Sequence, residues 1–198
     1  MTTSMIKKIG IMVLIAAVGL GACKSKKNKA TPIEKQTGAI EITVPFSSKE
    51  FFSDKEEFRS TSSGNSPDLQ TAKKIALQNA KSQMASLIST TIKKVTDQYT
   101  EQRVIDKNVD FNNKFEELAR EVTNQELNDV KIIGEKAFKE QNGNYTYWVA
   151  IEANKQLILN GINKNISTGK KLEQDYDKKK FEEIFNSEMQ KLAKERGN

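Results

Sequence analysis

A long helical pattern limits the fold of this chain more than any other run of residues. Ser66 is a good N-cap, Pro67 suits the first helical position and Asp68 favours the positive end of the helix dipole. Mostly apolar residues then recur at steps of three, four or one over about thirty residues, which places them on one helical face: Leu69, Ala72, Ala76, Ala80, Met84, Leu87, Ile88, Thr91, Val95 and Tyr99. The pattern predicts a helix that needs a partner along its whole length.

Three alanines on this face are spaced by four: Ala72, Ala76 and Ala80. Their small side chains would let the helix lie close on a sheet or on another helix. The alternative is an exposed groove of small residues that binds a partner. We favour the close-packing interpretation.

Two strand candidates, 130–138 and 145–153, flank Asn142-Gly143. This dipeptide predicts a two-residue type I′ hairpin, because both turn positions need positive φ. Such a turn sets the cross-strand pairs as Phe138 with Tyr147, Lys136 with Val149, Gly134 with Ile151, and Ile132 with Ala153. Trp148 then falls on the opposite face, beside Ala137.

The remaining patterns are shorter. Alternation over 40–46 predicts a strand or an extended arm, although Pro45 makes a poor central strand. A strand at 57–62 precedes a Ser/Gly/Asn loop at 60–66. Helices are expected at 110–127, 154–163 and 171–195, with these residues inward: Phe111, Phe115, Leu118, Ala119, Val122, Leu157, Ile158, Ile162, Tyr176, Phe181, Ile184, Phe185, Met189 and Leu192.

Together these elements predict an α+β fold. A small antiparallel sheet of about three strands, including the 130–153 hairpin, is packed by the long helix and a second helix, with an added C-terminal helix. We expect a leader at 1–22, a flexible tether at 23–38, an α/β domain at 39–165 and a helical extension at 166–198.

The leader reads as an export signal that ends at a lipidation site. Lys7 and Lys8 precede an apolar run at 9–20, which is shorter than the ~20 residues that span a bilayer. Leu20-Gly21-Ala22-Cys23 follows and resembles the bacterial lipobox, in which small residues admit the peptidase before a diacylated cysteine. The alternatives are a plain secretory signal with an incidental cysteine and an uncleaved membrane anchor.

Lipid on Cys23 would tie the chain to a membrane, since stable anchoring takes at least two lipid signals. Four lysines at 24–29 could meet anionic head groups or belong to a solvated tether. Surface-exported lipoproteins of the Bacteroides group typically have acidic residues after the cysteine, and no acidic run follows Cys23. This comparison implies the periplasmic face of the bacterial outer membrane rather than the cell surface.

Composition excludes several chemistries. The chain has no histidine and one cysteine, so Ser–His and Cys–His nucleophiles, intramolecular disulfides and cysteine zinc sites are ruled out. Asp106, Asn108, Asp110, Asn112 and Glu117 imitate an EF-hand loop, but Phe111 replaces its glycine and Lys114 adds a positive charge. We expect no metal and no cofactor.

Other candidate chemistry is weak. The pairs Asp175/Asp177 and Glu182/Glu183 lie on a polar helix, where a solvated face is the better reading than acid–base work. The net charge of +6 comes from interleaved basic and acidic residues, so we expect no nucleic acid. Tyr145, Tyr147 and Trp148 could contact a ligand or partner, although hairpin aromatics more often form sheet core.

Several segments resemble the Lpp-twenty family of small bacterial envelope lipoproteins. They are 72–80, which continues to 92–95, then 126–134 and 145–152, and the similarity spans roughly 57–165. The tail at 175–181 is similar to members from the Bacteroides group. The resemblance implies a small antiparallel sheet with helices, and it supplies no active site.

The sequence therefore predicts a non-enzymatic envelope lipoprotein that presents its domain and its last helix to a protein or cell-wall partner. A small-ligand or peptidoglycan-fragment binder that uses the Trp148 face is the alternative. An enzyme relying on Asp, Glu, Lys, Tyr or Ser alone comes third.

Overall fold

The computed structural model describes residues 42–102, 108–168 and 176–197. From Ile42 onward the chain forms one compact unit. The expected leader, the lipobox residues Leu20, Gly21 and Ala22, the anchor Cys23 and the tether lie outside the described residues. The elements in order are η1 (Lys49–Phe51), β1 (Glu57–Ser66), α1 (Leu69–Gln102), α2 (Asn108–Glu126), η2 (Leu127–Asp129), β2 (Lys131–Lys139), β3 (Tyr145–Asn154), α3 (Lys155–Thr168) and α5 (Lys178–Gly197).

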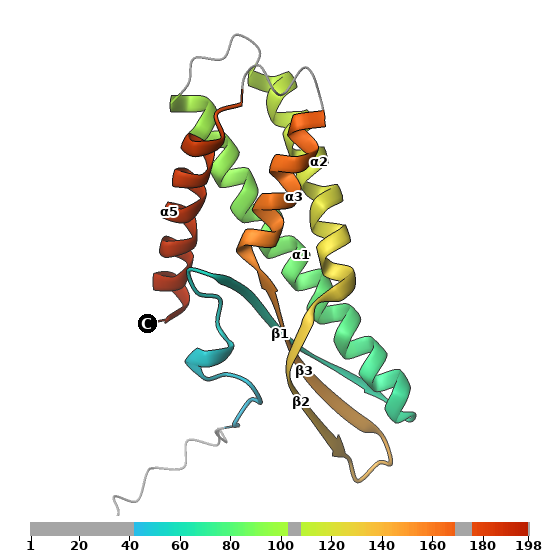
Figure 1. Cartoon of the computed structure of the whole chain (residues 1–198). Coiled ribbons are helices and arrows are strands. Elements are labelled where there is room, and N and C mark those ends of the chain that lie inside the picture. Colours follow the sequence, from blue (N-terminus) through green and yellow to red (C-terminus); the bar gives the residue numbers. More distant parts are fainter. Residues whose placement is uncertain (1–41, 103–107, 169–175, 198) are drawn as a thin grey trace, which may run out of the picture. The chain divides into compact units, whose positions relative to one another are not determined.

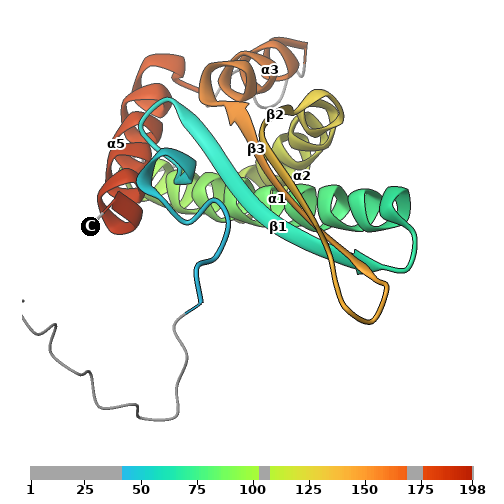
Figure 2. The ribbon, with the colours of Figure 1, turned by 90° about the horizontal axis from the view of Figure 1, so that it is seen from below.

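The α+β prediction is confirmed. The three strands form one antiparallel sheet in the order β1-β3-β2, and α1 crosses one face of it (Figures 1 and 2). The described part of the chain contains four α-helices. Because β3 is central, β1 and β2 each leave one edge unpaired by another strand.

The first half of α1 packs on β1 through small residues. Ala72, Ala76 and Ala80 are fully buried, and a Cβ added at Gly64 would lie 2.4 Å from the Ala72 carbonyl oxygen and 2.5 Å from the Ala76 nitrogen. Main chain meets main chain at this crossing. The close-packing interpretation of the alanines is therefore confirmed.

The second half of α1 packs against helices. Tyr99 stacks on Phe111 of α2 with ring centroids 5.9 Å apart, and Phe181 of α5 meets Tyr99 edge-on at 5.7 Å. Phe115 and Phe185 complete this aromatic core and are fully buried. The apolar side of α5 is thus buried within its own unit, so it does not serve as an exposed stripe for a partner.

The predicted hairpin exists, but its turn and register were wrong. The Gly143 N–H donates to the Glu140 carbonyl at 3.0 Å, and the Glu140 N–H donates to the Asn144 carbonyl at 2.8 Å. Gly143 alone has positive φ in this turn, at 88°. This is a three-residue loop, a type I turn followed by a left-handed glycine, and not the two-residue type I′ turn.

One extra loop residue shifts every cross-strand pair. Phe138 faces Thr146, Lys136 faces Trp148, and Ala137 faces Tyr147. Gly134 follows the same register and faces Ala150, and a bulge between Ile132 and Gly134 then shifts the pairing again, so that Ile132 faces Ile151. Phe138 accordingly lies on the face away from α1 and is 48% exposed.

Three further details of the first half of the chain differ from the predictions. Residues 60–66, which were expected to form a loop, continue β1. Their small side chains allow α1 to pack closely on the strand. Residues 42–46 form no strand; a turn at Pro45 and Phe46 interrupts them, and Phe46 has φ 59°. Asp68, rather than Ser66, caps α1 by accepting the Thr71 N–H at 2.7 Å.

The last two helices also differ in detail. In α3, Leu157 is 53% exposed and Leu159 is buried in its place, because α3 starts at Lys155 with Asn154 as its cap. The last helix begins at Lys178, later than expected, since Asp177 caps it by accepting the Lys180 N–H at 3.0 Å.

Candidate functional site

The three aromatic residues suggested as a contact site do not share a face. Tyr145 and Tyr147 lie on the face that meets α1, where Tyr147 is 8% exposed and Tyr145 packs against the core. Trp148 alternates to the opposite face, here called the outer face, where its neighbours are Ser63 on β1 and Lys136 on β2. A joint stacking site of all three is therefore wrong; Trp148 alone remains.

The outer face is partly covered by the segment before β1. A Cβ at Gly134 would lie 2.5 Å from Cε1 of Phe46, so the Phe46 ring rests directly on this glycine. Phe51 meets Phe46 edge-on with centroids 4.8 Å apart, and Lys136 Nζ lies 5.5 Å from the Phe46 ring. Trp148 is half-buried beside this cover, while Phe138 extends past it towards the hairpin tip.

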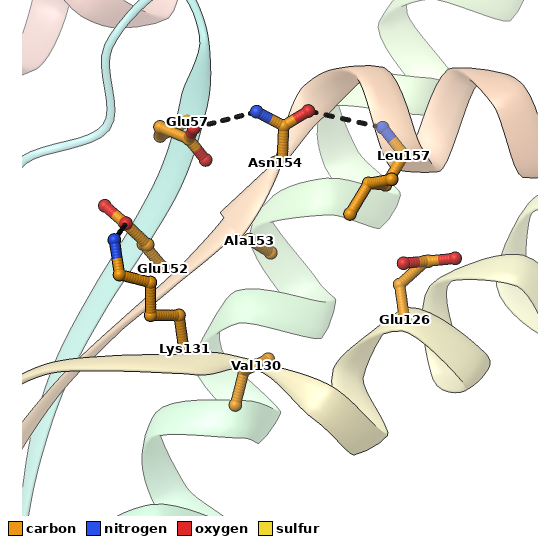
Figure 3. A pocket seen from close by; sticks show the side chains of 8 residues that line it. All are labelled: Glu57, Glu126, Val130, Lys131, Glu152, Ala153, Asn154 and Leu157. Atoms are coloured by element: carbon orange, nitrogen blue, oxygen red, sulfur yellow. Dashed lines mark hydrogen bonds and ion pairs between the residues drawn. The ribbon is translucent and has the colours of Figure 1, made fainter.

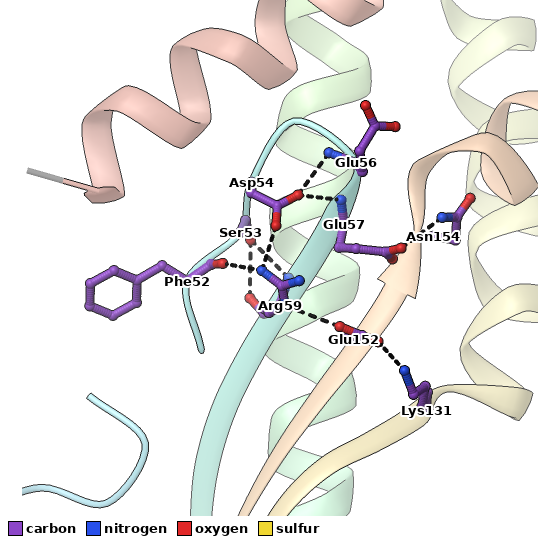
Figure 4. A network of polar contacts seen from close by, with 9 residues as sticks. All are labelled: Phe52, Ser53, Asp54, Glu56, Glu57, Arg59, Lys131, Glu152 and Asn154. Carbon is purple, nitrogen blue, oxygen red and sulfur yellow. Dashed lines mark hydrogen bonds and ion pairs between the residues drawn. The ribbon is translucent and has the colours of Figure 1, made fainter. Parts of the chain in front are cut away.

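A polar network closes one end of the outer face (Figure 4). Arg59 donates to Asp54 at 2.7 Å, to Glu152 at 3.1 Å and to the Phe52 carbonyl at 2.9 Å. Glu152 also pairs with Lys131 at 2.7 Å. Arg59 thereby joins β1, β3 and the loop before β1, and through Glu152 it reaches β2.

The charges of this network set the pKa values of its acids. Burial alone would raise the pKa of Glu152, but hydrogen bonds from Lys131 and Arg59 outweigh it and hold the pKa below its usual value. Burial alone would also raise the pKa of Asp54. Hydrogen bonds from the N–H groups of Glu56 and Glu57 and from the Arg59 guanidinium outweigh burial, so the pKa lies below its usual value. Both carboxylates are ionised near neutral pH, which suits structural pairing rather than proton transfer.

A hollow of about 240 Å³ lies beside the network, between the sheet, the end of α2 and the start of α3 (Figure 3). Glu57, Glu126 and Glu152 line it with Lys131. Asn154 donates to Glu57 at 2.8 Å and caps α3 with its carbonyl oxygen. The hollow combines acidic groups that are largely engaged in fold-forming contacts, so it does not present a ready acid–base pair.

A second polar cluster is internal. The Tyr176 hydroxyl donates to Asn163 at 2.6 Å, and Asn163 donates to Glu182 at 3.0 Å. Burial raises the pKa of Tyr176 well above its ordinary range, with Glu182 adding to the effect. Glu182, one of the suggested acid–base residues, thus joins α5 to α3, and the carboxylate of Asp177, another of them, caps α5. Glu183 is exposed, and Asp175 lies outside the described residues.

The EF-hand-like spacing falls mostly on a helix. Residues 108–117 belong to α2, so the last ten of its twelve places follow a helix rather than wrap around an ion as a calcium loop does. Asp106 lies outside the described residues. Among those described, no three acidic or sulfur ligands converge on a possible metal position.

Sequence reasoning missed the Arg59 network and the unpaired edge of β1. Arg59 directly precedes the predicted loop at 60–66, and nothing in its neighbours identifies Glu152, which is 93 residues away. The sequence indicated part of this network. Arg59 alternates with the inward Phe58 and Ser60, so its side chain points outward, where an ion pair with an acidic residue on the neighbouring strand could have been expected.

Comparisons with protein-family models, with curated proteins and with solved structures find no match to this chain. The resemblance to the Lpp-twenty lipoproteins therefore stays a prediction. None of the helices in the described residues has both the length and the apolar character that a membrane crossing needs.

Proposed function

We propose that this chain is a bacterial envelope lipoprotein, tied to a membrane by lipid on Cys23, whose folded part is a non-enzymatic interaction module. The observation that carries the proposal is the apolar run at 9–20 followed directly by Leu20-Gly21-Ala22-Cys23, with Cys23 the single cysteine of the chain. The compact unit begins only at Ile42, which leaves the 18 residues 24–41 between anchor and fold. We place the protein on the periplasmic face of the outer membrane, within the Lpp-twenty family.

A structural and binding role is supported by how the polar groups are used. Arg59, Glu152 and Asp54 hold strands and loop together, and Asn163 and Glu182 hold α5. Each group with a shifted pKa in these two clusters has a partner that belongs to the scaffold. An interaction module needs such a rigid frame and a free surface, and the outer face and the β1 edge provide one.

Mass spectrometry of the protein purified from its native cells tests the anchor. The expected result is an N-terminal Cys23 carrying a diacylglyceryl group, together with partition of the protein into detergent. The Cys23→Ser variant should stay unprocessed and lack the lipid mass. An intact leader with a free thiol, or a soluble unacylated product, would overturn the proposal; protease shaving of intact cells then distinguishes the two membrane faces.

A second candidate is a small-ligand or cell-wall-fragment binder. It is favoured by one observation: Trp148 is half-buried on the outer face between Ser63 and Lys136, with exposed Phe138 nearby. Because Trp148 is the only tryptophan, its fluorescence reports directly on this face. Titration with soluble peptidoglycan fragments should shift its emission, and a flat response up to saturating fragment removes this candidate.

A further inference from the structure

The two edges of the sheet are protected very differently. β2 carries Lys131, Glu135, Lys136 and Lys139 and contains the bulge at Ile132 and Gly134. Charges and bulges are the usual means by which proteins prevent an edge strand from pairing with another chain. The free edge of β2 is therefore guarded along most of its length.

The first half of β1 is also closed. Asp54 exchanges two hydrogen bonds with Glu57, using its N–H to the Glu57 carbonyl at 2.9 Å and its carboxylate for the Glu57 N–H at 2.9 Å. Ser53 does the same for Arg59, accepting its N–H at 2.8 Å and donating to its carbonyl at 3.2 Å. The loop before β1 thus occupies the outward main-chain groups of Glu57 and Arg59, mostly through the side chains of Ser53 and Asp54.

Beyond Arg59 this protection stops. In an antiparallel strand the main-chain groups of alternate residues point to the same edge, so Thr61, Ser63 and Asn65 continue the outward series of Glu57 and Arg59. Within the described residues only one of these groups has a partner, the Ser63 carbonyl, which accepts from Asn79 of α1 at 3.1 Å. A carbonyl oxygen retains a second lone pair.

The residues of this open edge carry no charge of their own, and the Glu140 carboxylate contacts them at Asn65, whose amide donates to it at 2.9 Å. In a chain that is 29% charged, residues 60–67 carry no charged side chain. The adjoining flank of α1 continues this character with Ile75, Asn79, Gln83, Ser86 and Thr90; Gln83 hydrogen-bonds Ser60 and Ser62, and Ser86 and Thr90 line a hollow with Ser60. Depletion of charge is a mark of the centre of protein interfaces.

We propose that the open edge of β1 pairs with the same edge of a second copy of this chain, antiparallel about Ser63, so that two three-stranded sheets become one. The spacing suits a two-fold axis, because Thr61 and Asn65 are equally distant from Ser63 along the strand. Thr61 of each copy faces Asn65 of the other, and Ser63 faces Ser63. In a two-fold contact each charge near the axis would meet its like, and the strand residues of this edge carry none.

The side chains fit the same arrangement. On the outer face, Thr61 and Ser63 are small polar residues that can hydrogen-bond across the pair, whereas the Asn65 amide is already bound to Glu140, Thr146 and Asn144 of its own chain. On the α1 face, Ser62 and Gly64 leave room near the axis, and Ile75, which is 38% exposed, lies directly over Gly64. Ile75 of the two copies would thereby approach each other above the joined sheet.

The test uses the chain from residue 23 with Cys23→Ser, which has no other cysteine and retains the whole compact unit. Sedimentation velocity over a concentration series should show a monomer–dimer equilibrium. Ser63→Lys places two like charges at the axis and should weaken the dimer roughly tenfold. Gln125→Lys, at an exposed position on α2 away from the β1 edge, is the control and should leave the equilibrium unchanged.

A disulfide provides the second measurement. Residues that exchange both hydrogen bonds have Cα atoms about 5.5 Å apart, which a disulfide can bridge. Ser63→Cys should therefore form a covalent dimer under mild oxidation much faster than Gln125→Cys. A chain that stays monomeric at its highest soluble concentration, a dimer indifferent to Ser63→Lys, or equal rates for the two cysteines would each overturn the proposal. None of these results depends on lipidation of Cys23.

Discussion

Replacing Gly64 by alanine tests the contact on which the fold depends most. Gly64 has no unusual φ, so space rather than backbone conformation requires glycine there. An added Cβ would lie 2.4 Å from the Ala72 oxygen, 2.5 Å from the Ala76 nitrogen and 2.7 Å from the Ile75 Cβ. Two of these atoms are helix main chain, which cannot rotate away, so α1 must move by about 1 Å to restore van der Waals distances.

The size of the effect follows from two opposing contributions. Overpacking a tight core costs up to ~3 kcal/mol, and a rigid helix backbone favours the upper end. Alanine also stiffens the unfolded chain and returns about 0.5–1 kcal/mol. The free energy of unfolding should therefore fall by about 2 kcal/mol, which lowers Tm by roughly 6 °C for a chain of this size.

Urea unfolding followed by circular dichroism and by Trp148 fluorescence measures this change. Ser63→Ala, at the next position but on the outer face, should change stability by less than ~0.5 kcal/mol. Adding Ala76→Gly to Gly64→Ala should not rescue it, because the clash is with the Ala76 nitrogen and not with its side chain. A Gly64→Ala protein as stable as the parent would refute the reasoning, and rescue by Ala76→Gly would place the clash elsewhere.

Three more outcomes follow from other contacts. Gly143→Ala should lower the free energy of unfolding by only about 1 kcal/mol, measured in the same urea experiment. The positive φ of 88° disfavours alanine, but nothing lies within 4 Å of the new Cβ. A larger loss would mean that the turn is not as described. Phe185→Ala should lower the free energy of unfolding by about 3–5 kcal/mol, because this ring is fully buried against Phe58 and Phe181. If only the helical signal of α5 were lost and the sheet stayed intact, the two would not share a core. Folding lowers the pKa values of Glu152 and Asp54. The two carboxylates therefore stabilise the fold above their ordinary pKa values of 4.5 and 3.8. This stabilisation is lost as pH falls through the lower pKa values of the folded state. Unfolding measured from pH 7 to pH 3 should show this acid loss, and Glu152→Gln should flatten it; an unchanged acid limb in the variant would exclude Glu152 as a contributor.

The candidate surfaces show where sequence reasoning reached its limit. Trp148 was correctly separated from the face of Tyr147 by strand alternation, which is a local property. Its neighbours were not predictable, because they depend on the loop length at Gln141 to Gly143 and on the bulge near Ile133. The Arg59–Glu152 pair required the pairing of β1 with β3, and the 78 residues between these strands carry no local sign of which strand β1 will join.

The sequence by itself determined the elements with strong periodicity, while the residues at which several of them begin were misplaced. The apolar stripes of α1, α2 and the last helix, the strand–turn–strand unit around Gly143 and the absence of histidine chemistry all follow from residue type and spacing. The tertiary structure alone decided three things: the register of the hairpin, the extension of β1 through its serines and Gly64, and the burial of α5 within its own unit. In each case the local preference was weak or ambiguous, and the choice was made by contacts between residues far apart in the chain, chiefly the main-chain contact of Gly64 with α1 and the aromatic core around Tyr99.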